Sequence, residues 1–268
     1  MTMNAPAQRP GQREFRKRLI NREPVVGSFL KFPGPHSTEI FGSIGYDFVM
    51  LDEEHSPWSR DQLGMGLLAA KAYDIASIVR ISRPDAASVL SMLDDGAIGI
   101  MMPHCNTAEK ARELASWSRY RGGSRGSGIA RSGDYGARPG GIEAHYDFSD
   151  STTAVIAMIE DADAIDRIDE ITAVEGIDAF FMGRGDLGLS LSNVQGTKPT
   201  VAEAAKIIAE SVLRNGKALC AVTHDMESDD AKAMKDIGVT GLMVGNDWGF
   251  MRGAALKQLG GFNALMKS

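Results

Sequence analysis

The chain is 268 residues long, a length typical of one (β/α)8 barrel and sufficient to bury a large core in a single domain. Hydrophobic residues make up 43% and charged residues 24% of the chain, as in an ordinary globular protein. The net charge of -6 argues against a nucleic-acid partner, which usually requires a basic face, and favours a small-molecule ligand.

Two cysteines, Cys105 and Cys220, lack metal-type spacing, so they predict buried thiols in a reducing compartment rather than a disulfide framework or a zinc site. No stretch of about 18 apolar residues exists, and the N-terminus lacks the apolar core of a secretory signal. The sequence therefore predicts a cytoplasmic protein without a membrane partner. We expect residues 1–12 to be a disordered tail and residues 13–268 to be one barrel catalytic domain that opens with a helix across the barrel bottom.

Eight short apolar runs alternate with longer helical patterns along the chain, which is the signature of βα units around a parallel sheet. Continuous apolar runs such as FVML, IGIMM and AVIAMI indicate strands that are buried on both faces. We expect strands at residues 25–30, 47–51, 77–81, 98–102, 154–159, 179–182, 218–222 and 241–244. Eight units favour a closed (β/α)8 TIM barrel, with a doubly wound open sheet as the alternative.

A glycine-rich segment, residues 121–141, joins the fourth expected helix to the fifth strand. Loops of this length in compact domains are usually lids, binding loops or interface arms. The segment is not a phosphate-binding P-loop, because no GKS or GKT follows and no strand directly precedes it. Arg125 or Arg131 could meet a substrate anion, and a structural or subunit-contact role is an equal alternative. We expect distal substrate specificity to lie in this segment and in neighbouring subunits.

Two carboxylates follow the apolar runs where barrel active sites lie, at the C-terminal ends of strands. Glu160 ends the fifth run, and Asp186 follows the sixth in GRGDLG. Two carboxylates with few other ligands suit a hard octahedral cation such as Mg²⁺ or Mn²⁺. A hydrogen-bonded carboxylate pair or helix N-caps are the alternative. The glycines around Asp186, which let backbone N–H groups approach an anion, favour the metal.

Further polar residues mark the ends of the second, third and fourth strands. Arg80 lies within the apolar run SIVRI and needs an anion, either from a substrate or in a salt bridge to Glu54 or Asp52. His55 follows Asp52 by three residues in LDEEHSPW, so this carboxylate could orient the imidazole as in a general-base dyad. His104, just past the fourth strand, is a weaker candidate of the same kind.

In this order and spacing, the motifs resemble the HpcH/HpaI aldolase family of the citrate-lyase-type superfamily of phosphoenolpyruvate/pyruvate-type barrels. The resemblance covers residues 24–256 and rests on GYDFVMLDEEHSP, SIVRISRPD, GAIGIMMPHCNTAEKAR, MIED followed by GIDAFFMGRGDLGLSL, and GLMVGNDW. It implies a class II aldolase that reversibly cleaves a 4-hydroxy-2-oxo acid to pyruvate and an aldehyde, through a pyruvate enolate stabilised by a divalent metal.

The resemblance also implies roles for individual residues. Glu160 and Asp186 would bind the metal, with Mg²⁺ or Mn²⁺ favoured over Co²⁺ or Zn²⁺, and the backbone N–H groups of Gly185 and Asp186 would hold the substrate carboxylate. Arg80 would stabilise the developing enolate oxygen. His55, paired with Asp52, would act as acid and base.

The implied assembly is a homohexamer or a trimer with active sites near subunit contacts. The C-terminal helix would be exchanged or packed between subunits, and Asp52 or Asp247 would then be able to act across an interface. Three departures from the family pattern bear on the substrate rather than on the chemistry. Met158 replaces a glutamine, Arg184 and Gly185 replace a proline and a small residue, and YRGGSRG stands in place of the proline-rich YPPxGxRG, which keeps Arg125.

Other functions share parts of this pattern. Pyruvate kinase has a similar GRGDLG segment, but a single barrel lacks the additional domains of that enzyme and a nucleotide loop. Coenzyme A thioester lyases of the citrate-lyase or malyl-CoA-lyase type share the carboxylate pair and remain an alternative. A non-catalytic barrel that only binds a keto acid is the non-enzyme alternative.

Overall fold

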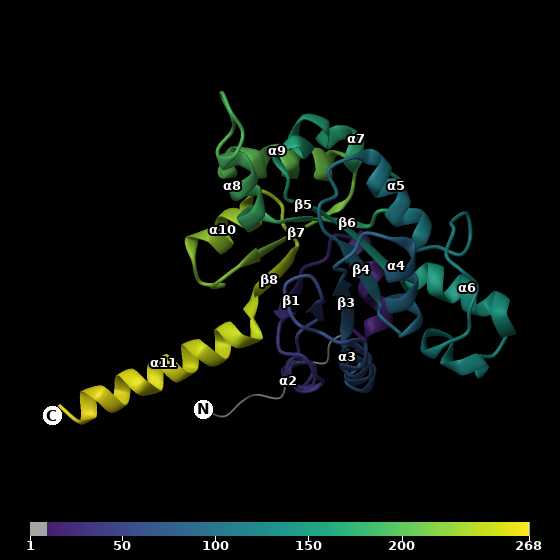
Figure 1. Cartoon of the computed structure of the whole chain (residues 1–268), viewed down its shortest axis with the longest axis horizontal. Helices are drawn as coiled ribbons and strands as arrows, with labels where there is room; N and C mark the ends of the chain where they lie inside the picture. Colours follow the sequence, from purple (N-terminus) through teal and green to yellow (C-terminus); the bar gives the residue numbers. More distant parts are fainter. Residues whose placement is uncertain (1–9, 268) are drawn as a thin grey trace.

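Eight parallel strands close into a barrel in the computed structural model, which describes residues 10–267 (Figure 1). Each strand pairs with its neighbours in sequence, and β8 pairs with β1. The strands are β1 (Val25–Leu30), β2 (Phe48–Asp52), β3 (Ala76–Arg80), β4 (Gly99–Met102), β5 (Ala154–Ile159), β6 (Ala179–Met182), β7 (Ala218–Thr223) and β8 (Gly241–Asn246). The predicted single (β/α)8 TIM barrel is confirmed, and every expected strand is present with its ends shifted by at most a residue or two.

Helices surround the sheet and connect its strands (Figure 1). The α-helices are α1 (Phe15–Ile20), α2 (His36–Ile44), α3 (Arg60–Ala72), α4 (Ala86–Asp94), α5 (Ala108–Trp117), α6 (Gly141–Thr152), α7 (Ile168–Thr172), α8 (Arg184–Ser192), α9 (Val201–Arg214), α10 (Asp229–Asp236) and α11 (Asp247–Leu265). Three short 3-10 helices are η1 (Gln12–Glu14), η2 (Arg131–Gly136) and η3 (Ala162–Arg167). In residues 10–267, no helix has the length and apolar character needed to cross a membrane.

Alternation along the strands places the polar residues at one end of the barrel interior. In β2, Val49 and Leu51 pack in the core between sheet and helices, whereas Phe48 and Met50 pack inside the barrel. Asp52 continues the inner series because side chains of a strand alternate between its two faces. The same parity puts Arg80 of β3 and Glu160, directly after β5, on the inner face at the barrel mouth.

The opposite end of the barrel is closed by the N-terminal helix. Phe15 and Leu19 of α1 are buried in the inner cluster, as expected for a helix across the barrel bottom, whereas Ile20 is exposed. Arg16 donates to both carboxylate oxygens of Asp178 at 3.0 and 2.9 Å. The expected disordered tail, residues 1–12, falls mainly on residues 1–9, which lie outside the described residues, and Gln12 begins η1.

The glycine-rich segment packs beside the barrel and not over its mouth. Arg125 is buried, donates to Asp94 at 2.9 Å and to Ser149 at 2.8 Å, and stacks on Tyr120. Arg131 donates to the carbonyl of Gly64 at 2.7 Å. Both arginines have structural roles in this chain. None of its residues lines the pocket at the C-terminal ends of the strands in the same chain, so a role of this segment in distal specificity stays a prediction.

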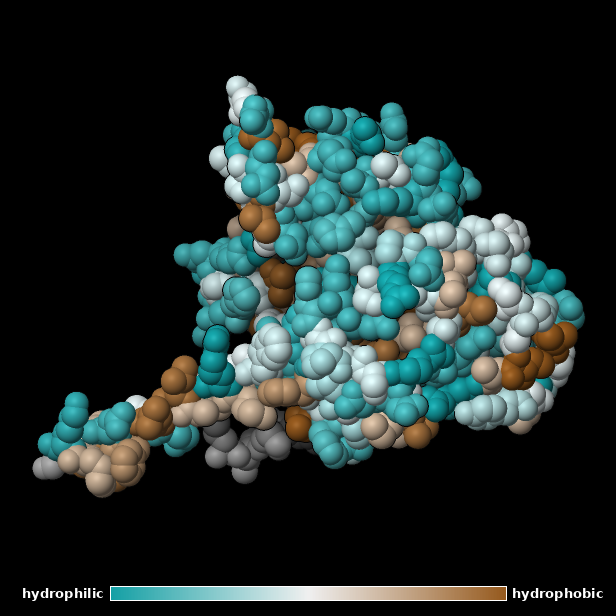
Figure 2. Space-filling view, in the orientation of Figure 1, coloured by the Kyte–Doolittle hydropathy of each residue, from teal (hydrophilic) through white to brown (hydrophobic). Residues whose placement is uncertain are grey.

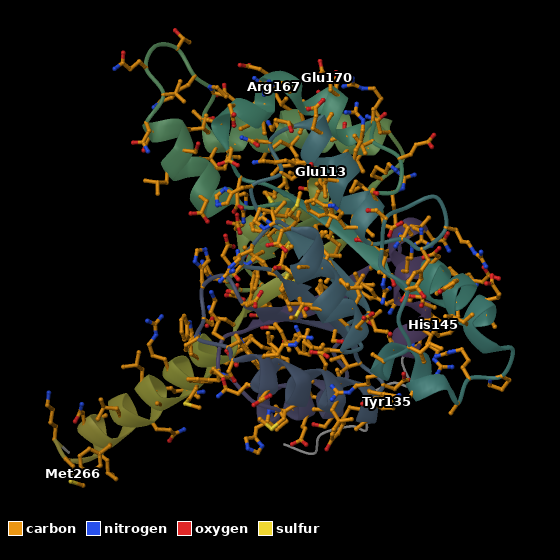
Figure 3. All side chains as sticks on the ribbon, turned by 45° about the vertical axis from the view of Figure 1, so that its right-hand side comes forward. Glu113, Tyr135, His145, Arg167, Glu170 and Met266 are labelled. Carbon is orange, nitrogen blue, oxygen red and sulfur yellow. The ribbon has the colours of Figure 1, made fainter. Side chains whose placement is uncertain are left out.

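The last helix, α11, leaves the barrel and projects away from it (Figures 1 and 3), with Met266 at its outer end. Its first turn stays in contact with the barrel, where the Phe250 ring lies 5.9 Å from that of Phe41. From Met251 onward every described residue is exposed. The exposed apolar side chains, seen in brown along the helix in Figure 2, include Met251, Leu256, Leu259, Phe262 and Leu265.

Asp178 offers a test of how the barrel bottom is held together. Its buried carboxylate binds Arg16, Arg119 at 3.2 Å, and the backbone N–H of Val155 at 2.9 Å. Asp178→Ala leaves two guanidinium groups without their counter-charge and should lower the free energy of unfolding by about 3–5 kcal/mol in urea denaturation. The exposed Asp236→Ala control should change it by no more than about 0.5 kcal/mol. Equal effects of the two variants would contradict this account.

Candidate active site

A pocket of about 430 Å³ opens at the C-terminal ends of the strands. Its walls come from seven strands or the loops that follow them, in agreement with the usual position of active sites in this fold. Among its lining residues are Lys31, His55, Arg80, Glu160, Asp186 and His224. With Gly185, the structure thus brings five of the predicted site residues together in one cavity, and adds Lys31 and His224, which were not predicted.

Asp52 and Arg80 form the buried centre of one wall. The guanidinium of Arg80 donates to both oxygens of Asp52, at 2.8 and 2.7 Å, and lies 3.1 Å from Glu54. The ammonium of Lys31 forms a second ion pair with Asp52. Burial raises the pKa of Asp52, but the hydrogen bonds and charges of Arg80 and Lys31 outweigh it and hold this pKa below its ordinary value. Both salt bridges considered as alternatives for Arg80 are therefore present.

His55 does not form the predicted dyad with Asp52. Only its backbone N–H reaches the Asp52 carboxylate, at 3.3 Å, because Arg80 and Lys31 occupy that carboxylate. The half-exposed imidazole instead lies 3.7 Å from Glu54. Asp52 consequently orients Arg80, and Glu54 is the acidic neighbour of His55.

Glu160 is a buried carboxylate on the opposite wall. Its Oε1 atom accepts from the backbone N–H of His104 at 2.9 Å, and it has no lysine or arginine partner in residues 10–267. Burial, together with the nearby negative charges of Glu54 and Asp186, raises the pKa of Glu160 to about 7, although contacts with His104 oppose the change. A buried carboxylate of this kind would gain stability from a bound cation.

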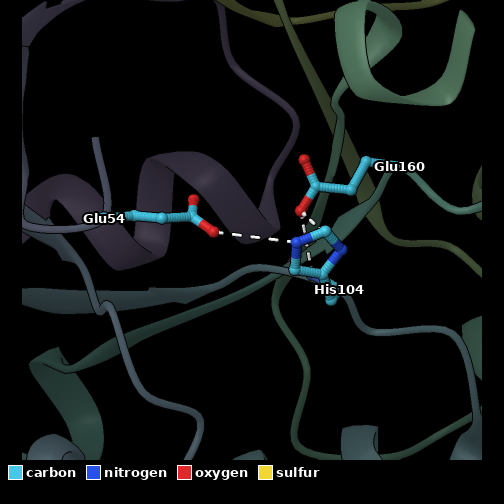
Figure 4. A group of neighbouring side chains, drawn as sticks. All are labelled: Glu54, His104 and Glu160. Atoms are coloured by element: carbon cyan, nitrogen blue, oxygen red, sulfur yellow. Dashed lines mark hydrogen bonds and ion pairs between the residues drawn. The ribbon is translucent and has the colours of Figure 1, made fainter. Parts of the chain in front are cut away.

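His104 lies between the acidic residues of the two walls. Figure 4 shows its ring between Glu54 and Glu160, at 3.8 and 3.6 Å from their oxygens, and Asp161 is 3.1 Å away. Its backbone has a φ of 52°, a left-handed conformation that is uncommon for residues other than glycine. Such strained positions cluster at functional sites. The weaker candidate of the sequence is thus in closer contact with Glu160 than His55 is.

The group best able to hold a metal in the described residues differs from the predicted pair. One donor atom each from Glu54, His104 and Glu160 lies within 4.8 Å of the others. Asp186 is not in this group, and its exposed carboxylate sits in the first turn of α8. Glu160 is common to both sets, and oxygen and imidazole donors suit several divalent cations. The donor chemistry present therefore fits a divalent metal at Glu160.

The start of α8 supplies unpaired backbone donors next to these carboxylates. Gly185 and Asp186 lie in the first turn, where N–H groups lack partners within the helix. The helix dipole adds a partial positive charge at this end, so the turn suits a carboxylate ligand. Gly183 precedes the helix, and a Cβ there would lie 2.7 Å from the Cβ of Glu160. Glycine at this position thus keeps the helix start close to Glu160.

Two of the positions that depart from the family pattern, Met158 and Arg184, make side-chain contacts at the pocket. The Sδ atom of Met158 lies 4.0 Å from Nη1 of Arg80, so a thioether lines the cavity beside the guanidinium. Arg184 pairs with both oxygens of Asp230, at 2.6 and 2.8 Å, and donates to the carbonyl of Val222 at 2.8 Å. Arg184 therefore ties the start of α8 to α10 at the pocket rim.

Comparison with known proteins places the chain among aldolases and related enzymes. Residues 26–252 match the family described as HpcH/HpaI aldolase/citrate lyase. The hydroxypyruvate/pyruvate aldolase of Delftia acidovorans is 33% identical, with 93% of this chain and 92% of that protein covered. The 5-keto-4-deoxy-D-glucarate aldolase of Klebsiella pneumoniae is 29% identical, with 91% and 94% covered.

Solved structures of similar proteins have the same architecture. The crystal structure of citrate synthase SbnG is 29% identical and superimposes with a TM-score of 0.81, over 94% of this chain and 98% of that one. An HpcH/HpaI aldolase from Desulfitobacterium hafniense is 26% identical with a TM-score of 0.84, over 92% and 95%. The barrel and its connections are therefore shared along nearly the full length.

The raised pKa of Glu160 predicts how stability depends on pH without metal. A carboxyl with a folded-state pKa near 7 and an ordinary unfolded pKa stabilises the fold below about pH 4.5, and this contribution is lost as the pH rises to 7. In metal-free buffer, urea denaturation between pH 5 and 8 should show a smaller loss of stability with rising pH for Glu160→Gln than for the wild type. Parallel pH profiles would count against a titrating Glu160.

Proposed function

The chain belongs to the HpcH/HpaI aldolase/citrate lyase family, as its motifs predicted, and on this premise we propose that it is a class II pyruvate aldolase. It is a carbon–carbon lyase, and the proposed reaction is the reversible cleavage of a 4-hydroxy-2-oxo acid to pyruvate and an aldehyde. The observation that carries the proposal is the pocket in which Arg80, Glu160 and the start of α8 converge. We further propose a cytoplasmic enzyme, since both cysteines are free and buried.

A divalent cation, Mg²⁺ or Mn²⁺ before Co²⁺ or Zn²⁺, would be held by Glu160 and Asp186, with Glu54 and His104 within reach as further donors. When bound, it would supply Lewis-acid polarisation of a 2-oxo acid. A bound cation would also explain why Glu160 is buried without a lysine or arginine partner in residues 10–267. The side chains of His104 and Asp186 are half-exposed and exposed, respectively, so each can change its rotamer to reach a cation bound at Glu160.

Arg80 would stabilise negative charge on the carbonyl oxygen of the substrate. Its guanidinium is fixed by two hydrogen bonds to Asp52 and lies at the pocket wall, so it requires little reorganisation during the reaction. The N–H groups of Gly185 and Asp186 would bind the substrate carboxylate at the helix start. Asp52 thereby acts as a positioning residue for Arg80.

His55 would transfer the proton at the pocket mouth. It is half-exposed, lines the pocket and has Glu54 as its acidic neighbour, so it can exchange protons with solvent and with a bound hydroxyl group. Asp52 contributes through Arg80 and not, as the sequence predicted, through the imidazole. Asp247 accepts from the backbone of Lys31 and Phe32 at 2.9 and 3.1 Å, so it braces the pocket within its own chain.

The decisive measurement is exchange of the pyruvate methyl protons in deuterated water, followed by NMR with Mg²⁺ or Mn²⁺. Exchange should require metal, stop after chelation, and be lost in Glu160→Ala. Arg80→Ala should slow it by about 10² or more, because the oxygen that gains charge loses its fixed partner. The matched control Glu113→Ala, at an exposed site on α5 (Figure 3), should exchange like the wild type.

The outcomes separate the proposed function from its alternatives. Cleavage of malyl thioesters without any exchange on free pyruvate would favour a coenzyme A thioester lyase. Binding of pyruvate without exchange under any metal would favour the keto-acid-binding barrel. A near-normal rate in Arg80→Ala would refute its role in charge stabilisation while leaving the aldolase reaction itself intact.

We also propose that α11 packs against, or exchanges with, another subunit in a hexamer or trimer. Its exposed apolar side chains form a surface of the kind that marks protein interfaces. Trp248 is the second residue of this helix, and its ring lies 5.5 Å from the ammonium of Lys31 in the pocket. The helix that would join subunits thus starts at the wall of the active site.

Sedimentation velocity can test this assembly. The wild type should sediment as a hexamer or trimer, and the double variant Leu256→Glu with Phe262→Glu should dissociate, because buried charges would replace buried apolar side chains. An exposed control, Lys257→Glu, on the same helix should retain the assembly if the apolar face forms the contact. A wild-type monomer at all concentrations would rule out this role for α11.

A further inference from the structure

A second cavity lies at the opposite end of the barrel from the active site. Its volume is about 70 Å³, well above the ~10–15 Å³ that one water molecule needs. Ala97 and Ile98 before β4 and Thr153 before β5 form its floor, which places it at the N-terminal ends of the strands. The cavity therefore has room for a small polyatomic ligand that could not reach the active site.

Four cationic side chains from three separate segments line this cavity. They are Arg13 of η1, Lys71 of α3, and Arg131 and Arg138 of the glycine-rich segment. Asp134 is the one carboxylate among the lining residues, and it pairs with Lys71 at 2.7 Å and Arg138 at 2.9 Å. The lining thus has an excess of positive charge, because one carboxylate faces four cations.

The neighbouring charges do not remove this excess. Asp95 pairs with Arg60, and Arg131 reaches only the carbonyl oxygens of Gly64 and Asp95, at 2.7 and 3.3 Å. In residues 10–267, neither Arg13 nor Arg131 forms an ion pair with a carboxylate. The hydrogen bond from Lys71 and the charges of Lys71, Arg138 and Arg13 hold the pKa of Asp134 below its ordinary value, as expected beside several cations.

Polar groups at the cavity lack partners. Nε of Arg138 and Oγ of Ser132 are buried, and neither has a hydrogen-bond partner among the described residues. Unpaired buried donors cost free energy and usually indicate a missing water, ion or ligand. The guanidinium of Arg138 is fixed by stacking on Phe148 at 3.7 Å, so its free N–H is held in place.

The backbone around these donors is strained. Asp134 and Tyr135 both have positive φ values, 52° and 54°, in successive residues of the glycine-rich segment. Such conformations persist where the surrounding structure stabilises them, and they are frequent at ligand-binding positions. Figure 3 shows Tyr135 on the side of the barrel away from α11. Of the two residues with positive φ, Asp134 lines the cavity.

We propose that this cavity is a phosphate-binding site, for inorganic phosphate or the phosphoryl end of a small ester. A phosphate group has a charge of about −1.5 to −2 and several outward oxygens, which match cations that approach from separate segments better than a planar carboxylate does. Bound phosphate would join η1, α3 and the glycine-rich segment at the barrel bottom. The proposal does not depend on the reaction catalysed at the mouth.

Calorimetric titration of metal-free protein with inorganic phosphate, at constant ionic strength in chloride buffer, tests the site. The wild type should bind phosphate saturably, and Arg138→Gln and Arg131→Gln should each weaken binding by about tenfold or more, as expected for a lost charge-assisted hydrogen bond. Arg112→Gln, which removes an exposed arginine on α5, should bind like the wild type. Ser132→Ala is a milder change that should also weaken binding.

Further titrations identify the ligand and exclude the active site. If glycerol phosphate binds more tightly than inorganic phosphate, the ligand is a phosphate ester. If inorganic phosphate binds more tightly, the ligand is the free ion. Succinate that binds while both phosphates do not would overturn the proposal. Phosphate binding that is unchanged in Arg138→Gln, Arg131→Gln and Ser132→Ala would also overturn it, and would place the ion elsewhere. Circular dichroism spectra check that each variant retains a folded barrel, whether or not the protein exchanges the methyl protons of pyruvate.

Discussion

The ion pair between Asp52 and Arg80 is the interaction on which the active-site wall depends. Asp52 is fully buried, and a buried charge of this kind is tolerated only when its partners are close and well oriented. Arg80 meets this condition with two hydrogen bonds, and Lys31 adds a third contact from the end of β1. The three strands that carry these residues are adjacent in the barrel, so the sheet fixes the guanidinium before any substrate arrives.

The opposite wall has the reverse electrostatic character. Glu160 is buried without a lysine or arginine partner in residues 10–267, and the carboxylates of Asp161 and Asp186 lie nearby or line the same pocket. At the first wall, the carboxylate of Asp52 neutralises the positive charge of Arg80. At Glu160, the negative charge would be neutralised by an added cation. This asymmetry explains how one small pocket could polarise a 2-oxo acid from one side and stabilise the charge that develops on the other.

The strands and their polar ends were predictable because both depend on local pattern. Continuous apolar runs located all eight strands, and the residues that follow them include Asp52, His55, Glu160 and Asp186. The sequence did not predict which side chains these residues contact. Two carboxylates, Asp52 and Glu54, lie near His55 in sequence, and only the competition from Arg80 and Lys31 decides which one orients its ring. His224 lacks a motif, and Lys31 merely follows a strand, so long-range packing alone reveals them.

The position of Lys31 has a consequence for how activity would be measured. Its ammonium contacts Asp52 within the pocket and lies over the ring of Trp248, the second residue of the protruding helix. A shift in the position of that helix would therefore move the ring beside Lys31, whose ammonium also balances the charge of Asp52. If neighbouring chains hold the helix in place, dilution itself becomes an experimental variable, and specific activity at nanomolar protein need not equal that in a crowded cell.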